Sequence, residues 1–154
     1  MANQHWVGTW ASTPAPADGV ALSQPTIRMF PRISIGGDSI RIRLSNAHGT
    51  GPLNISAVTV ALRGPGASIA PGTCRAVTFN GERAGTIRPG TMLISDPVDF
   101  KVAPLTDLAV SVYLPDEIPA SFVVTGRYAR QFNYISPPGD FTADHVIPAG
   151  RVTD

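Results

Sequence analysis

Ser39 is the side chain in this sequence whose setting most suggests a nucleophile, because it stands in the run Gly37-Asp38-Ser39-Ile40. An activated serine needs a histidine base, a carboxylate that orients the base, and backbone N–H groups that stabilise the oxyanion. Such a serine stands on a sharp strand-to-helix turn, whereas Ser39 precedes the alternating segment 40–44. His145 directly follows Asp144, and neighbouring side chains of an extended chain point to opposite sides. We therefore interpret Ser39 as an ordinary turn residue and expect no catalytic residue in this chain.

Metal binding is the next chemistry that the residue types could support. The histidines His5, His48 and His145 lie far apart and lack the paired spacing of zinc ligands. Four aspartates could offer oxygen ligands to Ca²⁺, but their spacing does not make an organised loop: Asp96, Asp99, Asp140 and Asp144. We predict no metal site and no cofactor.

Trp6 and Trp10 are the aromatic candidates for a binding surface. They stand four residues apart, so in an extended segment both rings point to the same side. Two such rings could stack on sugar rings, or they could pack against the sandwich or a neighbouring domain. We favour the packing interpretation. The same alternatives apply to three tyrosines that we expect to be exposed, Tyr113, Tyr128 and Tyr134.

An arginine strip is expected on the polar face of the first predicted hairpin, made of Arg28, Arg32, Arg41 and Arg43, with Phe30 between the first two. Guanidinium groups bind carboxylates with two parallel hydrogen bonds, so the strip could contact a carboxylate-bearing polymer or an acidic partner surface. Eleven acidic residues nearly balance the twelve basic ones. We therefore favour local pairing of these arginines with aspartate or glutamate on adjacent strands.

The loop 45–51 is the candidate for polar residues presented by a rigid sheet. Asn46 and His48 directly follow a predicted buried strand and lie among glycines. The alternative interpretation is a turn in which the Asn46 side chain binds its own backbone, and the sequence does not distinguish the two.

Length and charge narrow the class of protein. A chain of 154 residues buries about two-thirds of its unfolded surface, so one domain needs no disulfide, and the single Cys74 cannot form an internal one. The net charge of +1, with 15% charged residues, argues against nucleic-acid binding by phosphate neutralisation. No stretch approaches the roughly 20 apolar residues of a membrane span.

The positioning elements are predicted to be strands throughout. Fifteen glycines and fifteen prolines are scattered along the chain and leave no window for a good amphipathic helix. Beyond the first hairpin we expect strands at 53–62, 75–79, 84–88, 91–95, 108–114, 121–126 and 130–135, with a bulge near Ser56-Ala57. Turn signals separate most of them: Gly64-Pro65-Gly66, Asn80-Gly81, Pro89-Gly90, Pro115-Asp116 and Pro137-Pro138-Gly139. This pattern predicts an all-β fold, an antiparallel β-sandwich that is jelly-roll-like.

The first hairpin is predicted from alternation over 26–35 and 40–44. Its inward residues are expected to be Ile27, Met29, Ile33, Ile35, Ile40, Ile42 and Leu44. Gly36-Gly37-Asp38 is read as the reversing turn, since glycine tolerates a positive φ. Pro31 cannot donate a ladder hydrogen bond, so the first strand is expected to lie at a sheet edge or to carry a bulge.

Several segments together resemble the N-terminal region of the bacterial SGNH/GDSL esterases and acylhydrolases. They are His5-Trp6-Val7-Gly8-Thr9-Trp10-Ala11-Ser12, the segment 40–49, Pro71-Gly72-Thr73, Ser95-Asp96-Pro97-Val98, the segment 108–115 and the segment 136–144. In that family this region is a β-sandwich, and hydrolysis is performed by a flavodoxin-like domain that follows it. Gly37-Asp38-Ser39 spells the family's nucleophile block. The other blocks, Gly-x-Asn-Asp and Asp-x-x-His, are absent from this sequence.

The resemblance implies that residues 1–154 form a single accessory domain of a carboxylic-ester hydrolase, without a triad of its own. Its partner would be the SGNH catalytic domain, in the same parent chain or as a cleaved fragment, and its location secreted or periplasmic. The sandwich would stabilise that domain and help to shape access of the ester substrate, with Trp6, Trp10, Asn46 and His48 as contact candidates. The alternative is an autonomous carbohydrate-binding module, which would expose a coplanar aromatic platform.

Overall fold

The computed structural model describes residues 5–12, 15–16, 20–120, 124–125, 132–148 and 150–153, with the backbone alone at 15–16 and 124–125. Strands make up 48% of the structure and helix 1%, and the sheets are antiparallel. The prediction of an all-β, sandwich-like fold is therefore confirmed. Of the tyrosines named above, Tyr128 lies outside the described residues, as does most of the predicted strand 121–126.

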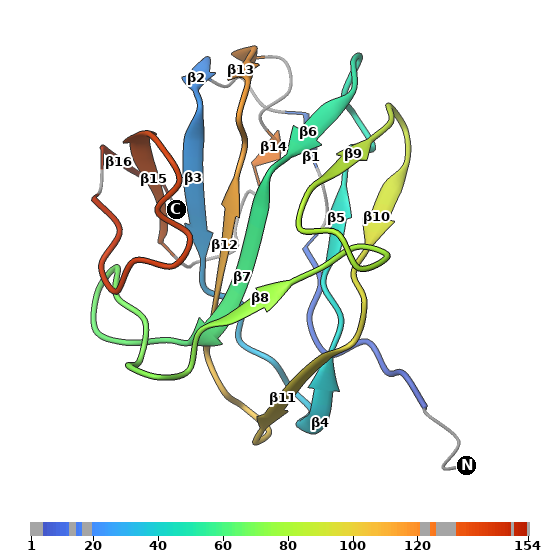
Figure 1. The fold of residues 1–154 in the computed structure, drawn as a ribbon, viewed down its shortest axis with the longest axis vertical. Helices are drawn as coiled ribbons and strands as arrows, with labels where there is room; N and C mark the ends of the chain where they lie inside the picture. The colour runs from blue at the N-terminus through green and yellow to red at the C-terminus, as the bar shows by residue number, and fades with distance from the viewer. Residues whose placement is uncertain are drawn as a thin grey trace.

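The larger layer is a six-stranded antiparallel sheet (Figure 1). Its order across the sheet is β16 (Arg151–Thr153), β15 (Asn133–Pro138), β3 (Pro25–Met29), β12 (Leu108–Tyr113), β7 (Ala57–Leu62) and β8 (Arg75–Val77). β3, β12 and β7 are central, so each has ladder partners on both sides.

The second layer is built from three strand pairs. β4 (Gly37–Ile40) pairs with β11 (Val98–Val102), β5 (Arg43–Ser45) with β10 (Met92–Ile94), and β6 (Leu53–Ile55) with β9 (Gly85–Ile87). Ser95 joins the first two pairs, because its N–H donates to the Ile42 carbonyl and its hydroxyl accepts from the Ile42 N–H. Two short pairs complete the fold: β2 (Leu22–Ser23) with β13 (Glu117–Ile118), and β1 (Ala15–Pro16) with β14 (Val124–Thr125).

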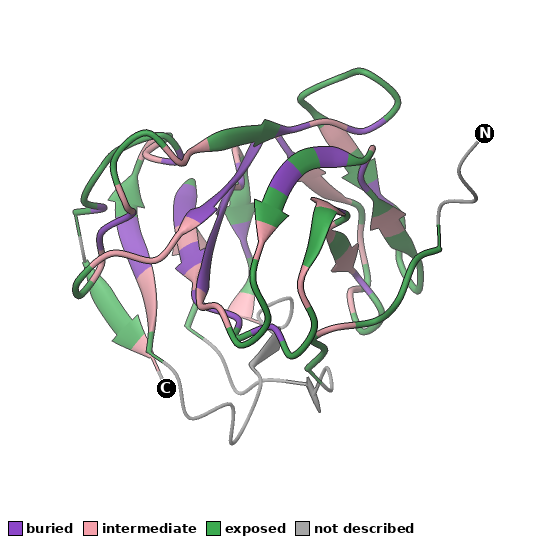
Figure 2. Cartoon of the chain, turned by 90° about the horizontal axis from the view of Figure 1, so that it is seen from below, coloured by how far each residue is buried: buried purple, intermediate pink, exposed green. Residues whose placement is uncertain are grey.

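The main core fills the space between the layers. Alternate residues of the central strands point into it, namely Val58 and Val60 of β7 and Leu108, Val110 and Val112 of β12. The second layer contributes Ile40, Ile55, Ile87, Val98 and Phe100. Figure 2 shows these buried segments lying between exposed outer strands. Burial of each aliphatic side chain of this kind is worth about 1.5–3 kcal/mol, so the core accounts for the pairing of the two layers.

The opposite face of the six-stranded sheet, which we call the back face, is covered by two loops, 63–74 and 139–148. Ile69 of the first loop packs on Phe30, Ala61 and Ala109. The loops meet each other, since the Ile69 N–H donates to the His145 carbonyl and Ser68 bridges to Val146. Central strands are thus buried on both faces, which is why β7 and β12 each have five fully buried residues of six.

The predicted first hairpin is wrong. β3 pairs with β12 and β15 in the six-stranded sheet, whereas β4 pairs with β11 in the second layer. Gly36 and Gly37 lie outside the left-handed region, so they do not form the predicted reversing turn. Gly36 is instead a close approach, since a Cβ there would collide with the Val102 carbonyl. Ile35, expected inward, is 51% exposed.

Pro31 does not mark a sheet edge. β3 ends at Met29, lies between β15 and β12, and leaves Pro31 beyond its end as an acceptor for the Leu108 N–H. The irregularity in pairing with β15 falls between Ile135 and Pro138, on the partner strand.

The Asn80-Gly81 turn signal is confirmed. Asn80 and Gly81 both have positive φ, 54° and 83°, in a two-residue turn closed by hydrogen bonds between Phe79 and Glu82. Ser56 breaks the predicted strand 53–62 into β6 and β7, which enter different layers. The strands β1, β2, β11, β13 and β16 were not predicted.

Candidate functional site

Arg28 is buried on the back face and does not belong to an exposed arginine strip. Its Nε donates to the Ser111 hydroxyl at 2.8 Å. Its two terminal nitrogens donate to backbone carbonyls of Ala67, Phe141, Thr142, Asp144 and His145 at 2.8–3.4 Å. Burial lowers the pKa of Arg28, and the charges of Cys74 and Asp144 act in the opposite direction. A single guanidinium therefore joins the central strands to both covering loops, a structural role that the sequence did not predict.

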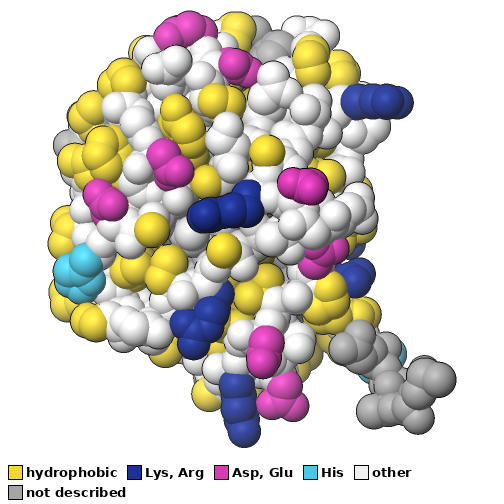
Figure 3. Space-filling view, viewed as in Figure 1, with side chains coloured by type: hydrophobic (Ala, Val, Ile, Leu, Met, Phe, Trp, Pro, Cys, Tyr) yellow, Lys and Arg dark blue, Asp and Glu magenta, His cyan; other side chains and the backbone are white. Residues whose placement is uncertain are grey.

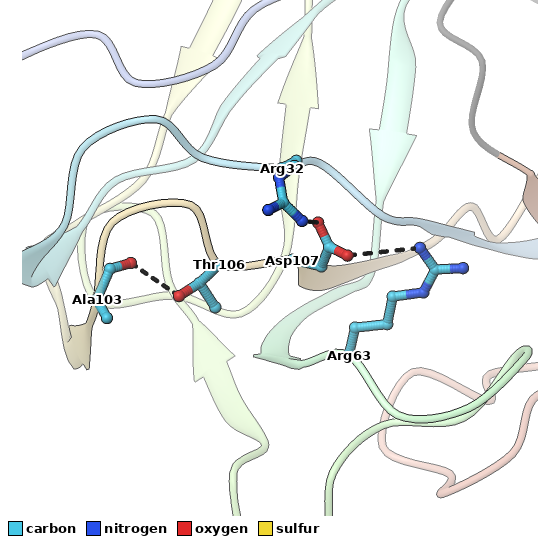
Figure 4. A network of polar contacts seen from close by, with 5 residues as sticks. All are labelled: Arg32, Arg63, Ala103, Thr106 and Asp107. Atoms are coloured by element: carbon cyan, nitrogen blue, oxygen red, sulfur yellow. Dashed lines mark hydrogen bonds and ion pairs between the residues drawn. The ribbon is translucent and has the colours of Figure 1, made fainter.

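Arg32 is paired locally, as predicted for this group (Figure 4). Its Nη1 lies 3.2 Å from Asp107 Oδ1, and Arg63 Nη1 lies 3.8 Å from Asp107 Oδ2. Arg63 also stacks on the buried Phe30 ring, at 4.5 Å from its centroid. The carboxylate belongs to Asp107, which directly precedes β12 and is also bridged to Arg32 through the backbone. Arg32 therefore already has an acidic partner within this chain.

Arg41 and Arg43 behave differently, because both are exposed on the second layer. The Arg41 guanidinium lies over the Trp6 ring, 4.9 Å from its centroid. Arg43 Nη2 lies 4.0 Å from the Met92 sulfur. Within the described residues, neither arginine has a carboxylate at ion-pair distance.

The outer side of β5 and β10 joins these groups into one surface. Ile94 is directly opposite Arg43 and Met92 is opposite Ser45, while Leu93 and Leu44 occupy the alternate, inward positions. Met92 is 56% and Ile94 47% exposed. Cross-strand neighbours share a face, so we define the contact face as Trp6, Arg41, Arg43, Met92 and Ile94. The sequence did not predict Met92 and Ile94 as site residues, because alternation in 91–95 does not reveal which side of the strand faces the core.

The N-terminal segment that carries both tryptophans is anchored beside β4. Thr9 Oγ1 donates to the Ile35 carbonyl at 2.9 Å and accepts from the Ile35 N–H at 2.8 Å, and the Thr9 carbonyl accepts from Ser34. Trp6 is 40% and Trp10 47% exposed. Among the described rings, the pair in contact is Phe30 with Tyr134, edge to face at 5.9 Å. Tyr134 and Tyr113 are half-buried, not exposed as expected.

Asn46 and His48 are placed very differently within one loop. Asn46 is buried, and its amide donates to the carbonyls of Gly51 and Ile87 at 2.9 and 3.0 Å. Its backbone N–H donates to Thr91, the residue before Met92. His48 is exposed. Asn46 thus holds the loop beside the contact face, and His48 is the member of the pair that solvent or a partner can reach.

Ser39 lies within β4, opposite Asp99 of β11, in a strand and not at a strand-to-helix turn. In the segments that the structure describes, no three His, Cys, Asp or Glu residues gather as a metal site. No described helix is long and apolar enough to cross a membrane. Figure 3 shows cationic and anionic side chains interspersed across one face of the molecule, without a field of one sign.

Asp96 is an organised carboxylate close to the contact face. It accepts hydrogen bonds from the Gly81 N–H at 2.8 Å, the Thr78 hydroxyl at 2.7 Å and the Asn80 N–H at 3.1 Å. The Gly81 bond above all, then Thr78, lowers the pKa of Asp96 below its ordinary value, with a smaller contribution from the Arg41 charge. Both oxygens are therefore engaged by the Asn80-Gly81 turn.

The two back-face loops form a shallow hollow of about 280 Å³, lined mainly by Ile69, Pro71, Cys74, Ala143 and His145. Cys74 is half-buried against Phe30 and Ala61. Because the hollow is shallow, open and lined mainly by apolar atoms, the contact face is the stronger candidate site.

Comparison with known proteins adds no relative: no protein-family model and no curated protein matches the chain. Membership in the SGNH/GDSL hydrolases therefore stays a prediction that depends on the segments quoted above.

Proposed function

We propose that this chain is the accessory N-terminal β-sandwich of a bacterial, exported SGNH/GDSL carboxylic-ester hydrolase. It stabilises the catalytic domain by binding it through the contact face. The observation that carries the proposal is the composition of that face. Arginine, tryptophan and methionine are the residue types enriched where two proteins meet, and here they are exposed side by side on one sheet surface.

The loop 45–51 gives the same proposal its second part, the shaping of substrate access. It adjoins the contact face through Ser45 and the Asn46 to Thr91 hydrogen bond. A loop held by buried hydrogen bonds presents its exposed residues in a fixed place. We infer that His48 lies at the rim of the acyl-ester cleft when the two domains are joined.

The first test is isolation of the natural protein from its bacterial source with an antibody against this chain. A fluorophosphonate probe labels the activated serine of a serine hydrolase. We expect the captured material to be labelled, with peptides from outside residues 1–154 that contain both Gly-Asp-Ser and Asp-x-x-His blocks. The isolated chain and its Ser39→Ala form, treated in parallel, are the control for labelling of Ser39 itself. A captured protein without any hydrolase sequence or label would contradict the proposal.

The second test mixes this chain with the separately produced catalytic domain. Binding to the folded state raises the melting temperature, because a partner present at 100 times its Kd adds about 2.7 kcal/mol. We expect association and a rise of several degrees in the melting temperature of the catalytic domain. Two pieces that neither associate nor alter that temperature at high concentration would remove the proposal's main support.

A carbohydrate-binding module is the second candidate, favoured by the exposure of Trp6 and Trp10. One face of Trp6 is occupied by Arg41, so sugar stacking would depend on its free face and on Trp10. Binding to insoluble polysaccharides that Trp10→Ala abolishes, and Arg151→Ala leaves intact, would replace the accessory-domain proposal by this one.

A further inference from the structure

The contact face contains two cations whose hydrogen-bonding edges are free. Stacking engages the flat side of a guanidinium, and its N–H donors lie in the plane, around the edge. The Arg41 Cζ lies over the Trp6 ring, 4.9 Å from its centroid, and among the described residues no acceptor takes a hydrogen bond from the Arg41 side chain. Arg43 contacts Met92 only through a sulfur at 4.0 Å, which is a weak acceptor.

The aspartates that have described partners do not satisfy these cations. The Arg41 charge acts on the Asp96 carboxylate through space, but the Asp96 oxygens accept hydrogen bonds from Thr78, Asn80 and Gly81. Asp107 serves Arg32 and Arg63 elsewhere on the molecule. Among the described residues, Arg41 and Arg43 are therefore cations held in place without a carboxylate of their own.

The surroundings of the two arginines indicate what kind of anion would bind. Ile94, Met92 and Trp6 are exposed apolar groups beside the guanidinium groups, so a partner that covers them also removes water from the charges. Exclusion of water strengthens a charge-assisted hydrogen bond. The Arg41 charge acts on Asp96, and Asp99 is paired opposite Ser39, two positions before Arg41, so both signs of charge occur in the surroundings of the arginines. A few carboxylates set in an apolar protein surface fit these conditions.

We propose that the contact face recognises a protein surface with an apolar centre and discrete aspartate or glutamate side chains that bind Arg41 and Arg43. This inference depends on the proposed function for the identity of the partner, which would be the catalytic domain. It adds the chemistry of recognition. The apolar side chains of the contact face supply most of the buried interface area, and the two arginines select a partner with matching carboxylates.

The experiment measures the affinity of this chain for the separately produced catalytic domain at 50 and 500 mM salt. The test variants are Arg41→Glu, Arg43→Glu and the double variant, with Arg41→Gln and Arg43→Gln as neutral forms. Arg151→Glu is the matched control, because Arg151 is exposed on the edge strand β16 of the other layer. Melting curves of each variant alone verify that the exposed substitutions leave the fold intact.

We expect each charge reversal to weaken binding at least about tenfold, the neutral forms to weaken it less, and salt to weaken the wild type. Arg151→Glu should stay within about twofold of the wild type. Tight binding whose affinity is unchanged by salt and by the Glu and Gln substitutions of Arg41 and Arg43 would overturn this inference and leave the proposed function in place. Absence of wild-type binding would overturn both. Binding of polygalacturonate to the isolated chain, lost in the double variant, would assign the arginines to an acidic polymer and overturn the inference as well.

Discussion

Arginines are buried on one outer surface of this sandwich and exposed on the other. On the back face, Arg28 is fully buried and donates to one hydroxyl and five carbonyls. On the second layer, Arg41 and Arg43 are exposed and rest on Trp6 and Met92. All three stand at similar places in an alternating pattern. The difference lies in what covers the sheet: loops from the same chain cover the back face, and nothing within the described residues covers the contact face.

The first prediction concerns the buried arginine of the back face and has the largest expected effect. Arg28→Met removes the six hydrogen bonds that the guanidinium donates, and it leaves the Ala67 and Asp144 carbonyls without a described donor. Acceptors that lose their partners inside the fold are costly. We expect a loss of about 3–5 kcal/mol in the free energy of unfolding, measured by denaturant titration. Arg28→Lys should also destabilise, because three ammonium donors cannot replace the planar set of five.

The matched control is Arg43→Met, which makes the same exchange on the exposed side. Its effect on the isolated chain should stay within about 0.5 kcal/mol. Equal effects of the two substitutions would contradict the distinction between a structural and a surface arginine.

Alternation within strands predicted part of the main core but not the back face. Ile40 lies in the main core, and Ile27 and Met29 pack against it, as the alternation of 26–35 and 40–44 predicts. Thr26, Arg28 and Phe30 alternate with them and look like a solvated face. They are buried because the loops 63–74 and 139–148 return over the sheet, and irregular loops have no periodicity that would reveal where they pack.

The candidate site was predicted in part for a related reason. Trp6, Arg41 and Arg43 are visible as residue types, but their union depends on an N-terminal segment anchored at Thr9 and on the β5–β10 register. Neither is encoded by local spacing. Asn46 could be read as a loop residue that binds backbone or as a polar residue offered to a partner, and its amide binds backbone carbonyls.

The second prediction concerns the loop that borders the contact face. Asn46→Ala leaves the Gly51 and Ile87 carbonyls without their donor and should cost about 1–3 kcal/mol in unfolding free energy. Gly49→Ala should destabilise the same loop, because the added Cβ would overlap the Asn46 side chain. His48→Ala, two residues from Asn46 but exposed, should leave stability nearly unchanged, and a large loss there would show that the loop depends on a different contact.

The third prediction tests why Asp96 does not pair with Arg41. The folded-state pKa of Asp96 lies below its ordinary value, so its stabilising effect is present above the unfolded pKa near 3.8 and is lost as pH falls through the folded value. We expect Asp96→Asn to be less stable than wild type at neutral pH and to lose less stability between about pH 4 and more acidic conditions. Asp99→Asn, whose carboxylate accepts none of the described hydrogen bonds, is the control for a general charge effect in the same unfolding series. A steeper acid loss in Asp96→Asn would contradict the assignment of Asp96 to the Asn80-Gly81 turn.

The smallest expected effect on stability belongs to the contact face itself. Ile94→Ser removes an exposed apolar side chain whose strand neighbour Leu93, not Ile94, packs on the core, so unfolding of the isolated chain should change by less than about 0.5 kcal/mol. The same substitution should reduce the binding of an environment-sensitive apolar dye, because it makes the exposed apolar surface that Ile94 shares with Met92 and Trp6 smaller. Val152→Ser, an exposed apolar residue on β16, is the matched control and should leave dye binding unchanged. If Ile94→Ser destabilised the chain as Arg28→Met does, the outer side of β10 would belong to the fold, and the contrast between the two surfaces would fail.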